Sequence, residues 1–396
     1  MCSSDLDMAV VGTGAVATTN IQQDTRTLPS SSADAHTSEK LAHAAVATKV
    51  AQAVAQHVAN IDKEGPLIVA ELSGNHQGDL DKAISLMDLA HQCGADMVKI
   101  QTYTEDSLTI ASSRPEFQLT SGLWKGYSYY DLYKEAKTPR EWMDPLFKHA
   151  REQGIVLFSS PFCPDDVDVL EKAGCPIYKI ASFELNYPQL IAYCAQTGKP
   201  LVMSTGLATL EEIDAAVQVA RDNGCQDLTI LHCESHYPAE PSMFNLRSIP
   251  FFKERYQCKV GLSNHAIGNV LDIAATALGA DMIEKHFALD RNTGIDAAFS
   301  MTPDELKALK QDTLATAQAL GIKGVRLSEL DWQKRSGRRS VYLVKDLKAG
   351  ETLTIDHVKI IRPDLGLDPY KLNDVLGHTA KEDLKAPLPL KLSSFN

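Results

Sequence analysis

Two histidines stand at matching places in the chain, each at the end of a short apolar run typical of a β-strand. His265 ends the run 260–265, and His286 ends the next one, 282–286. Imidazoles that meet at the ends of neighbouring strands can bind one divalent cation. Two histidines leave the coordination shell open to water and substrate, which suits Mn²⁺ or Mg²⁺, with Co²⁺ as a further candidate, better than structural zinc. Carboxylates that could complete this shell are Glu71, Glu234 and Asp296.

Lysines on two other predicted strands indicate an anionic substrate. Lys99 precedes Gln101 by two residues, so both side chains face the same side of their strand. Lys179 lies in the same way on a later strand. A buried ammonium is costly without an anionic partner, and a substrate phosphate or carboxylate would be one. Two other interpretations stay open, namely a Schiff-base aldolase that uses one lysine as nucleophile, and structural ion pairs.

Polar side chains end several of the remaining runs. Glu71 begins the segment 71–76, in which Asn75 and a histidine follow the carboxylate on a glycine-containing loop. Such a loop can bind sugar hydroxyls and orient a proton acceptor. Ser204 and Ser263 supply hydroxyl donors suited to a phosphate or an oxyanion, although either could simply cap a helix.

Eight short apolar runs, nearly all rich in β-branched residues, position these side chains. They are 67–71, 97–101, 156–160, 177–182, 201–205, 228–233, 260–265 and 282–286. Stretches of helical period, such as 80–93 and 210–223, follow all but the third run. Eight strand–helix units predict an α/β fold, a (β/α)8 TIM barrel, whose active site is built from the carboxyl ends of its strands. The layout is that of an enzyme.

The 396 residues of the chain exceed the roughly 250 that one such barrel needs. We expect an N-terminal extension (1–62) that is disordered or loosely helical, a barrel domain (63–325), a polar linker (326–337) and a small β-rich domain (338–396). The extension contains Gly12–Ala17, which fits a dinucleotide-binding fingerprint. No helical pattern follows it, and we interpret it as part of an irregular tail.

Composition excludes several classes of protein. A net charge of −12 argues against nucleic-acid binding, and the chain contains no run of 18 apolar residues that would span a membrane. Its eight cysteines form no CxxC pair. In a chain of this length they indicate reduced thiols in a cytoplasmic protein rather than a disulfide framework.

Seven ordered motifs lie between Pro66 and Leu390. They are 70–76, 99–102, 159–162, 178–182, 204–206, 284–287 and 338–340. In these motifs the chain resembles the sialic acid synthase family, whose members condense phosphoenolpyruvate with an N-acylated amino sugar. The insertion that contains Gly122–Gly126, together with Asp296–Ser300, is similar to the pseudaminic acid branch. That branch uses 2,4-diacetamido-2,4,6-trideoxy-L-altrose as its sugar.

The resemblance implies roles for the matching residues. The phosphoenolpyruvate site would comprise Lys99, Gln101, Ser160, Lys179, Ser182, Ser204 and Ser263. The amino sugar would contact Asn75, Tyr237, Asp296, Phe299 and Arg362. The metal ligands would be His265 and His286, and the catalytic residues would be Glu71, Glu184 and His286. The implied metal would polarise the aldehyde of the open-chain sugar.

The tail resembles the antifreeze-like (SAF) module of this family. Its Arg362 matches an arginine that reaches into the barrel of a partner subunit, which implies a domain-swapped homodimer. One departure concerns position 264, which is Asn where the family usually has Asp. N-acetylneuraminate or legionaminate synthesis remains the alternative within the family. A non-catalytic sugar-binding barrel is the more distant alternative.

Overall fold

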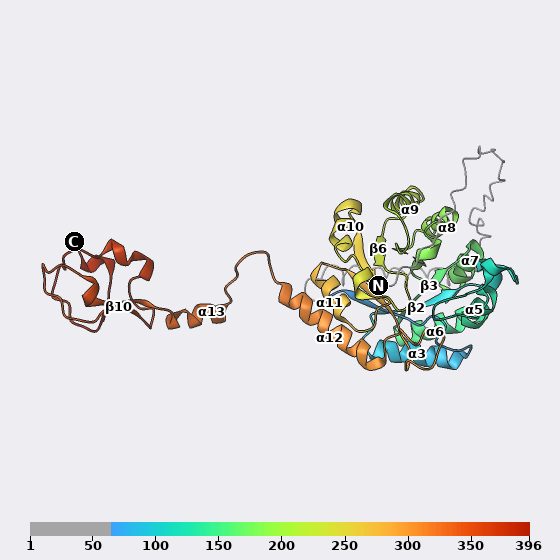
Figure 1. Ribbon diagram of the computed structural model, residues 1–396, viewed down its shortest axis with the longest axis horizontal. Helices are drawn as coiled ribbons and strands as arrows, with labels where there is room; N and C mark the ends of the chain where they lie inside the picture. The colour runs from blue at the N-terminus through green and yellow to red at the C-terminus, as the bar shows by residue number, and fades with distance from the viewer. Residues whose placement is uncertain (1–64) are drawn as a thin grey trace, which may run out of the picture. The chain divides into compact units, whose positions relative to one another are not determined.

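The computed structural model describes residues 65–396. The predicted N-terminal extension and its dinucleotide-like segment Gly12–Ala17 lie outside the described residues. The chain divides into two compact units, one ending at Leu320 and the other running from Gly321 to Asn396 (Figure 1).

The first unit is a closed barrel of eight parallel strands in sequence order, and the predicted fold is confirmed. The strands are β1 (Leu67–Glu71), β2 (Met97–Thr102), β3 (Val156–Pro161), β4 (Tyr178–Ile180), β5 (Leu201–Ser204), β6 (Leu228–Cys233), β7 (Lys259–Ser263) and β8 (Met282–His286). The barrel closes where β1 pairs with β8, and this register sets Glu71 opposite His286.

Helices surround the barrel (Figure 1). They are α3 (Leu80–Gln92), α4 (Glu105–Leu108), α5 (Tyr129–Ala136), α6 (Met143–Gln153), α7 (Pro164–Ala173), α8 (Pro188–Gln196), α9 (Leu210–Asp222), α10 (Ser248–Tyr256), α11 (Val270–Ala277) and α12 (Pro303–Leu320). Their apolar faces and the strands share one continuous core. Among the described residues, no helix is both long and apolar enough to cross a membrane.

Helix α7 corrects one sequence prediction, because we expected no helix after the third strand. Its first turn contains Pro164, a favoured residue at that place, and Asp166, whose carboxylate accepts the backbone N–H of Cys163 at 3.0 Å. Gly174 ends the helix in the left-handed conformation at φ 81°. Acidic residues are as numerous as apolar ones in this segment, and they weaken the periodic signal of the short apolar face that contains Val167 and Leu170.

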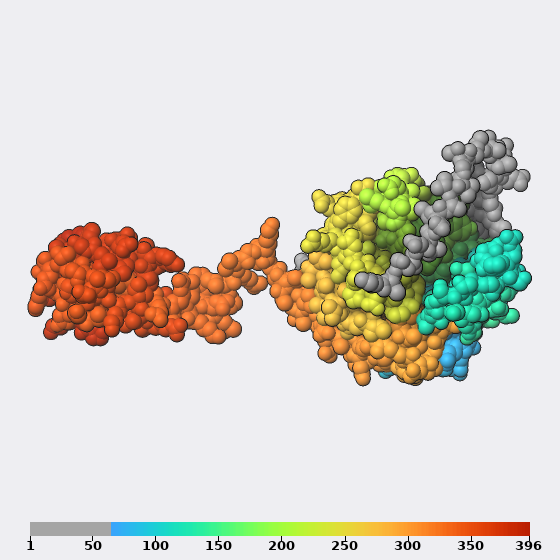
Figure 2. Space-filling view, in the orientation of Figure 1, coloured from blue at the N-terminus to red at the C-terminus, as the bar shows by residue number. Residues whose placement is uncertain are grey.

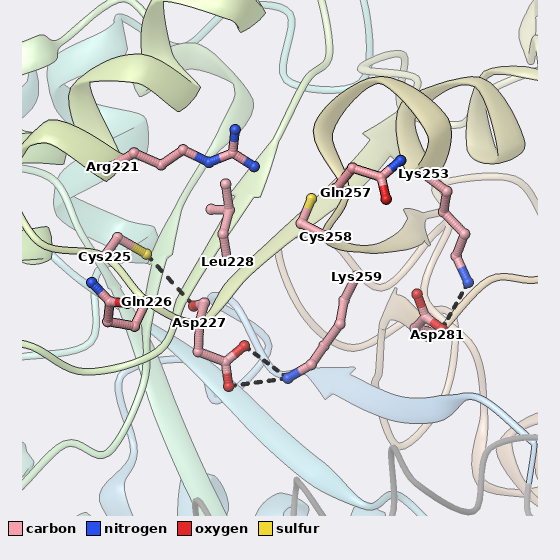
Figure 3. A pocket seen from close by; sticks show the side chains of 10 residues that line it. All are labelled: Arg221, Cys225, Gln226, Asp227, Leu228, Lys253, Gln257, Cys258, Lys259 and Asp281. Atoms are coloured by element: carbon pink, nitrogen blue, oxygen red, sulfur yellow. Dashed lines mark hydrogen bonds and ion pairs between the residues drawn. The ribbon is translucent and has the colours of Figure 1, made fainter.

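Ion pairs occupy the amino ends of several strands. A hollow with a cavity volume of about 520 Å³ opens at the amino ends of β6 and β7 (Figure 3). There Lys259 lies 2.7 Å from Asp227, and Lys253 lies 2.8 Å from Asp281. Asp281 also accepts the backbone N–H of Val260 at 2.8 Å, so its carboxylate ties β7 to the residue before β8.

A long insertion, residues 104–139, separates β2 from α6 and contains α4 and α5. It forms the teal part of the surface in Figure 2. Between the two helices the chain folds back on itself, with an antiparallel bridge from Gln118 to Ser128. The turn beyond this bridge contains Trp124.

Helix α13 (Glu329–Lys334) lies in the second unit, in the segment expected as a linker. Its N-cap is Ser328, whose hydroxyl accepts the backbone N–H of Asp331 at 3.1 Å. A three-stranded sheet follows in the order β10 (Val358–Ile361), β9 (Ser340–Leu343), β11 (Leu388–Pro389). This unit has its own hydrophobic core, which includes Val341, Leu343 and Leu390.

Candidate active site

The carboxyl ends of the strands bring the predicted site residues together. Register places Glu71 opposite both Lys99 and His286, and it places Gln101 opposite Ser160. Neighbours in register on parallel strands lie about 5 Å apart. Residues that are distant in the sequence therefore share one mouth of the barrel.

Two buried lysines and two buried glutamates form a charged cluster at this mouth. Lys99 Nζ lies 2.6 Å from Glu71 Oε2 and 3.6 Å from Glu284 Oε1. Lys179 Nζ lies 3.3 Å from the same Glu284 oxygen. All four side chains are at most 6% exposed. Both lysines point inward, as the sequence predicts, and each is near a protein carboxylate before any substrate binds.

The cluster shifts the pKa of each lysine in a different direction. Burial disfavours the Lys99 ammonium, yet Glu284 and Glu71 outweigh this effect and raise its pKa. Burial lowers the pKa of Lys179, because Glu284 offsets that penalty only in part. Lys179 and Lys99 overcome the effect of burial on Glu284 and lower its pKa to about 2. Glu284 is therefore a carboxylate at neutral pH.

Glu284 is a central residue that the sequence interpretation did not select. Besides both lysines it accepts a hydrogen bond from the Ser263 hydroxyl at 3.1 Å. Lys99 in turn donates to Ser160 Oγ at 3.4 Å. The sequence did contain a signal for Glu284. It precedes His286 by two residues on β8, so the two side chains face the same side of the strand.

Glu71 is held in place by three donors. It accepts the backbone N–H of Ser73 at 2.8 Å and the Gln101 amide at 3.2 Å, in addition to its ion pair with Lys99. The Ser73 hydroxyl donates to Asp296, which links β1 to the loop after β8. The orientation of the Glu71 carboxylate is thus determined by its neighbours.

The two predicted metal ligands lie side by side, with ring centroids 5.3 Å apart. His265 Nδ1 donates to the backbone carbonyl of Glu234 at 2.7 Å, which leaves its Nε2 as a lone-pair donor. His286 Nδ1 lies 3.4 Å from Asp296 Oδ2, and this buried nitrogen has no hydrogen-bond partner within residues 65–396. Two adjacent imidazoles and one nearby carboxylate fit an open divalent site.

The carboxylates of the other two candidates for the metal are engaged by other partners. Glu71 belongs to the lysine cluster, and the Glu234 side chain pairs with His236. Within the part of the chain that the structure describes, no group of three or more His, Cys, Asp or Glu side chains is arranged to hold an ion. Any metal bound here would complete its shell with water or substrate.

Tyr237 and Phe299, both predicted to contact the sugar, border the histidine pair. The Tyr237 ring lies 4.4 Å from the His265 ring, and the Phe299 ring lies 4.8 Å from the His286 ring. Asn75 is also near, but its amide is fully engaged, since it donates to Phe287 O at 3.0 Å and accepts the Asp296 N–H at 3.1 Å. Its present contacts anchor the loop after β8.

Ser182 and Glu184 follow β4, and Ser204 ends β5. Burial raises the pKa of Glu184 to about 7, and its Oε2 has no hydrogen-bond partner among the described residues. Ser182 Oγ accepts the backbone N–H of Gly206 at 3.1 Å. Ser204 Oγ is buried and has no partner in the described part of the chain. A Cβ at Gly206 would lie 2.1 Å from Ser235 Oγ, so glycine allows the backbone at position 206 to lie this close to the Ser235 side chain.

A separate buried network supports the loop that contains His265. Lys285 donates to Asp272 at 3.1 Å and to the carbonyl oxygens of Ala266 and Gly268. Asn264 donates to the other Asp272 oxygen at 2.7 Å and accepts the Ala266 N–H at 2.8 Å. An amide suits position 264 because the carboxylate that pairs with Lys285 is supplied by Asp272.

Arg362, the remaining predicted sugar contact, lies in the second unit directly after β10. The loop around it is fixed by the buried Ser340 hydroxyl, which donates to Pro363 O at 3.0 Å and accepts the N–H groups of Leu365 and Gly366 at 3.2 and 2.9 Å. Ser340 is the last residue of the motif 338–340, so this motif has a structural role inside its own unit.

Comparison with known proteins identifies the family. Residues 86–324 match the NeuB family and residues 338–395 match the SAF domain. The chain belongs to the NeuB family, a family of enzymes, and the predicted resemblance is confirmed.

Individual relatives agree with this assignment. The chain is 41% identical to the pseudaminic acid synthase of Campylobacter jejuni over 85% of its length and 98% of the relative. It is 33% identical to the N,N'-diacetyllegionaminic acid synthase of that species, over 81% of this chain and 97% of the relative. Among solved structures, N-acetylneuraminic acid synthetase from Leptospira borgpetersenii matches with a TM-score of 0.62 and 28% identity, over 69% of this chain and 90% of that one.

Proposed function

We propose that this enzyme is a pseudaminic acid synthase, which condenses phosphoenolpyruvate with 2,4-diacetamido-2,4,6-trideoxy-L-altrose and water to give pseudaminic acid and phosphate. The observation that carries the proposal is the meeting of the lysine–glutamate cluster and the histidine pair in one barrel mouth. The 41% identity to a pseudaminic acid synthase, against 33% to a legionaminic acid synthase, supports this choice of sugar.

Phosphoenolpyruvate would bind at the buried lysines. Lys99 and Lys179 would turn toward its phosphate and carboxylate, and Gln101, Ser160, Ser182, Ser204 and Ser263 would donate hydrogen bonds. The buried Ser204 hydroxyl, which has no partner among residues 65–396, supports this role, because such a group is costly to bury unless a ligand satisfies it. Lys179, whose ammonium is the less stabilised of the two, gains most from an anionic ligand.

A divalent cation, Mn²⁺ or Mg²⁺ with Co²⁺ as a third candidate, would be held by His265 and His286. When bound, it would supply Lewis-acid polarisation of the sugar aldehyde. The charge balance supports a cation, because the described mouth contains two lysines against the carboxylates Glu71, Glu284 and Asp296. A phosphate ester would add further negative charge, so positive charge is needed close by.

The reaction would form one C–C bond and one C–O bond to water and break the C–O bond to phosphate, while the aldehyde oxygen gains a proton and the added water loses one. C3 of phosphoenolpyruvate attacks the aldehyde carbon, and water adds to the cationic C2 that results. The tetrahedral intermediate then loses phosphate. Glu184 is the better acceptor for the water proton, because its pKa of about 7 suits a general base and its Oε2 is unpartnered among the described residues. Glu71, paired with Lys99, would orient the sugar hydroxyls.

Arg362, Tyr237, Phe299, Asp296 and Asn75 would complete the sugar site. Arg362 would come from a partner subunit, which makes a domain-swapped homodimer part of this proposal. The proposal of a domain-swapped homodimer rests on the resemblance and on the presence of the SAF domain.

A cytoplasmic location is proposed as well, supported by the seven described cysteines, all of which are free thiols.

The test is a phosphate-release assay with purified protein, phosphoenolpyruvate and Mn²⁺. Three sugars are compared: the diacetamido-trideoxy-L-altrose, the corresponding legionaminic acid precursor and N-acetylmannosamine. We expect release with the first sugar, little with the others, and none after chelation. Faster release with either other sugar would assign the sibling activity. Absence of release with all three, together with sugar binding, would indicate the non-catalytic barrel.

A further inference from the structure

Trp124 lies at the turn of the insertion, where the chain folds back on itself. The backbone N–H of Leu119 donates to Tyr127 O at 2.9 Å, and that of Gly126 donates to Leu119 O at 2.9 Å. Gly126 adopts φ 103°, a conformation open to glycine. This short hairpin presents Trp124 between two exposed neighbours, Leu123 and Lys125.

The indole is tied to a distant part of the barrel. Trp124 Nε1 donates to the backbone carbonyl of Ile295 at 3.1 Å, across 171 positions of sequence. Its ring lies 5.5 Å from Tyr237 and 6.5 Å from Phe299, in tilted and edge-to-face geometry. Aromatic pairs at these separations attract each other. The turn of the insertion is thereby joined to the loops after β6 and β8.

Together Trp124, Tyr237 and Phe299 form a cluster that we call the aromatic wall. Tyr237 and Phe299 themselves lie 5.3 Å apart. Two members of the aromatic wall touch the histidine pair, at 4.4 Å for Tyr237 and His265 and at 4.8 Å for Phe299 and His286. In the proposed function, a sugar whose aldehyde reaches the histidines would have these rings beside it.

We propose that Trp124 is a specificity-determining residue that selects amino sugars with apolar substituents. This inference rests on the proposed function and deepens it. The diacetamido-trideoxy sugar has a methyl group at C6 and two acetamido methyls, all of which can lie against ring faces. N-acetylmannosamine has hydroxyl groups at C4 and C6, and these would lose hydrogen bonds to water beside the rings.

The hydrogen bond from Nε1 adds a second contribution. It fixes the indole by its polar edge, so the ring face is pre-positioned before the sugar arrives. Phenylalanine at position 124 would keep an apolar ring but would lose this tether. The two effects can therefore be separated by comparing Trp124→Phe with Trp124→Ala.

The test uses steady-state kinetics on the full chain with Mn²⁺, for wild type, Trp124→Ala, Trp124→Phe and the control Leu123→Ala. Leu123 is the adjacent residue, 42% exposed and outside the aromatic wall. In Trp124→Ala we expect kcat/KM for the diacetamido sugar to fall about 10- to 100-fold, mainly through KM, with KM for phosphoenolpyruvate within about twofold. In Trp124→Phe this kcat/KM should fall less than in Trp124→Ala, and in Leu123→Ala it should not change.

The deciding quantity is the ratio of kcat/KM for the diacetamido sugar to that for N-acetylmannosamine. This ratio should drop about tenfold in Trp124→Ala. An unchanged ratio, or an equal rise in KM for phosphoenolpyruvate, would overturn the proposal and assign Trp124 a structural role. Thermal melting of each variant identifies any loss that is due to unfolding.

A second measurement separates this proposal from the proposed function. Tryptophan fluorescence is followed while the diacetamido sugar is added in the absence of phosphoenolpyruvate. We expect a change in wild type that is absent in Trp124→Phe. If wild type shows this change but releases no phosphate, the proposed function fails and the aromatic wall stands. If phosphate is released and the fluorescence of the two proteins changes equally, the aromatic wall fails.

Discussion

The two ends of the barrel contain the same kind of ion pair in different surroundings. At the carboxyl end, Lys99 and Glu71 lie 2.6 Å apart and are 5% and 0% exposed. At the amino end, Lys259 and Asp227 lie 2.7 Å apart but are 23% and 40% exposed (Figure 3). The two ion-pair distances are similar, so the two pairs differ mainly in hydration, because the buried pair has lost its contact with water.

This difference separates structural charges from functional ones. The amino-end pairs keep much of their hydration and contribute little energy beyond fixing strand ends. The buried pairs at the mouth carry a desolvation penalty that their attraction does not reliably offset. Buried charges of this kind cluster at functional sites, and the proposed phosphoenolpyruvate site lies at the carboxyl end of the barrel. The buried pair of Lys285 and Asp272, which supports the loop of His265, is a structural exception.

The largest expected effect is on stability. Lys99→Met leaves Glu71 and Glu284 buried without their shared cation, and we expect a loss of about 3–5 kcal/mol in the free energy of unfolding. The matched change at the amino end, Lys259→Met, should cost at most about 1 kcal/mol. Urea unfolding followed by tryptophan fluorescence measures both. Equal losses would remove the distinction between the two ends.

Turnover provides the next contrast. Glu71→Gln and His286→Ala should each lower kcat by at least about 10²-fold while still folding. Glu71→Gln should destabilise less than Lys99→Met, because Lys99 keeps Glu284 as a partner at 3.6 Å. Asp227→Asn, the corresponding carboxylate change at the amino end, should leave kcat unchanged. Wild-type rates in either mouth variant would refute the roles assigned to these residues.

Glu184 links stability to pH. Because burial raises its pKa from 4.5 to about 7, the folded protein binds this proton more tightly than the unfolded chain does. Stability therefore falls as pH rises through this interval, and Glu184→Gln should be more stable than wild type at pH 8 by about 1–3 kcal/mol.

The same variant should turn over more slowly and lose the rise of kcat with pH near 7. Such a rise is expected if ionised Glu184 accepts the water proton. Thermal melts and pH–rate profiles of the two proteins measure these effects. A variant with lower stability at pH 8, or with an unchanged profile, would contradict the assignment.

A further effect on stability concerns the network behind His265. Asn264→Asp would bring a second carboxylate against Asp272, and Lys285 can neutralise only one, so we expect a loss of about 1–3 kcal/mol. Adding Asp272→Asn moves the charge to position 264 and should restore most of the stability. A double-mutant cycle measures this coupling. Additive losses would show that the two positions are independent.

Much of the fold was predictable because barrel strands repeat a simple pattern. Apolar runs that end in polar residues located all eight strands, with ends within about two residues of those observed. The same alternation that paired Lys99 with Gln101 would also have located Glu284, two residues before His286. Helix α7 was missed because acidic residues alternate with the few apolar ones along this short segment and weaken its helical period.

Other parts of the site had no local signal. Trp124 sits in a turn without periodicity, and its contact with Ile295 depends on the closure of the whole barrel. The engagement of Asn75 by Phe287 and Asp296 depends in the same way on a distant loop. Contacts of this kind follow from tertiary structure and cannot be read from spacing.

The Ser340 hydroxyl has a consequence for how Arg362 can act. By gathering one carbonyl and two amide groups, it holds the adjoining turn in a single shape while the module is still free of ligand. A guanidinium mounted on a rigid turn loses little backbone entropy on capture of a hydroxylated ligand. In the proposed function, Arg362 would therefore contact the sugar from a preorganised turn.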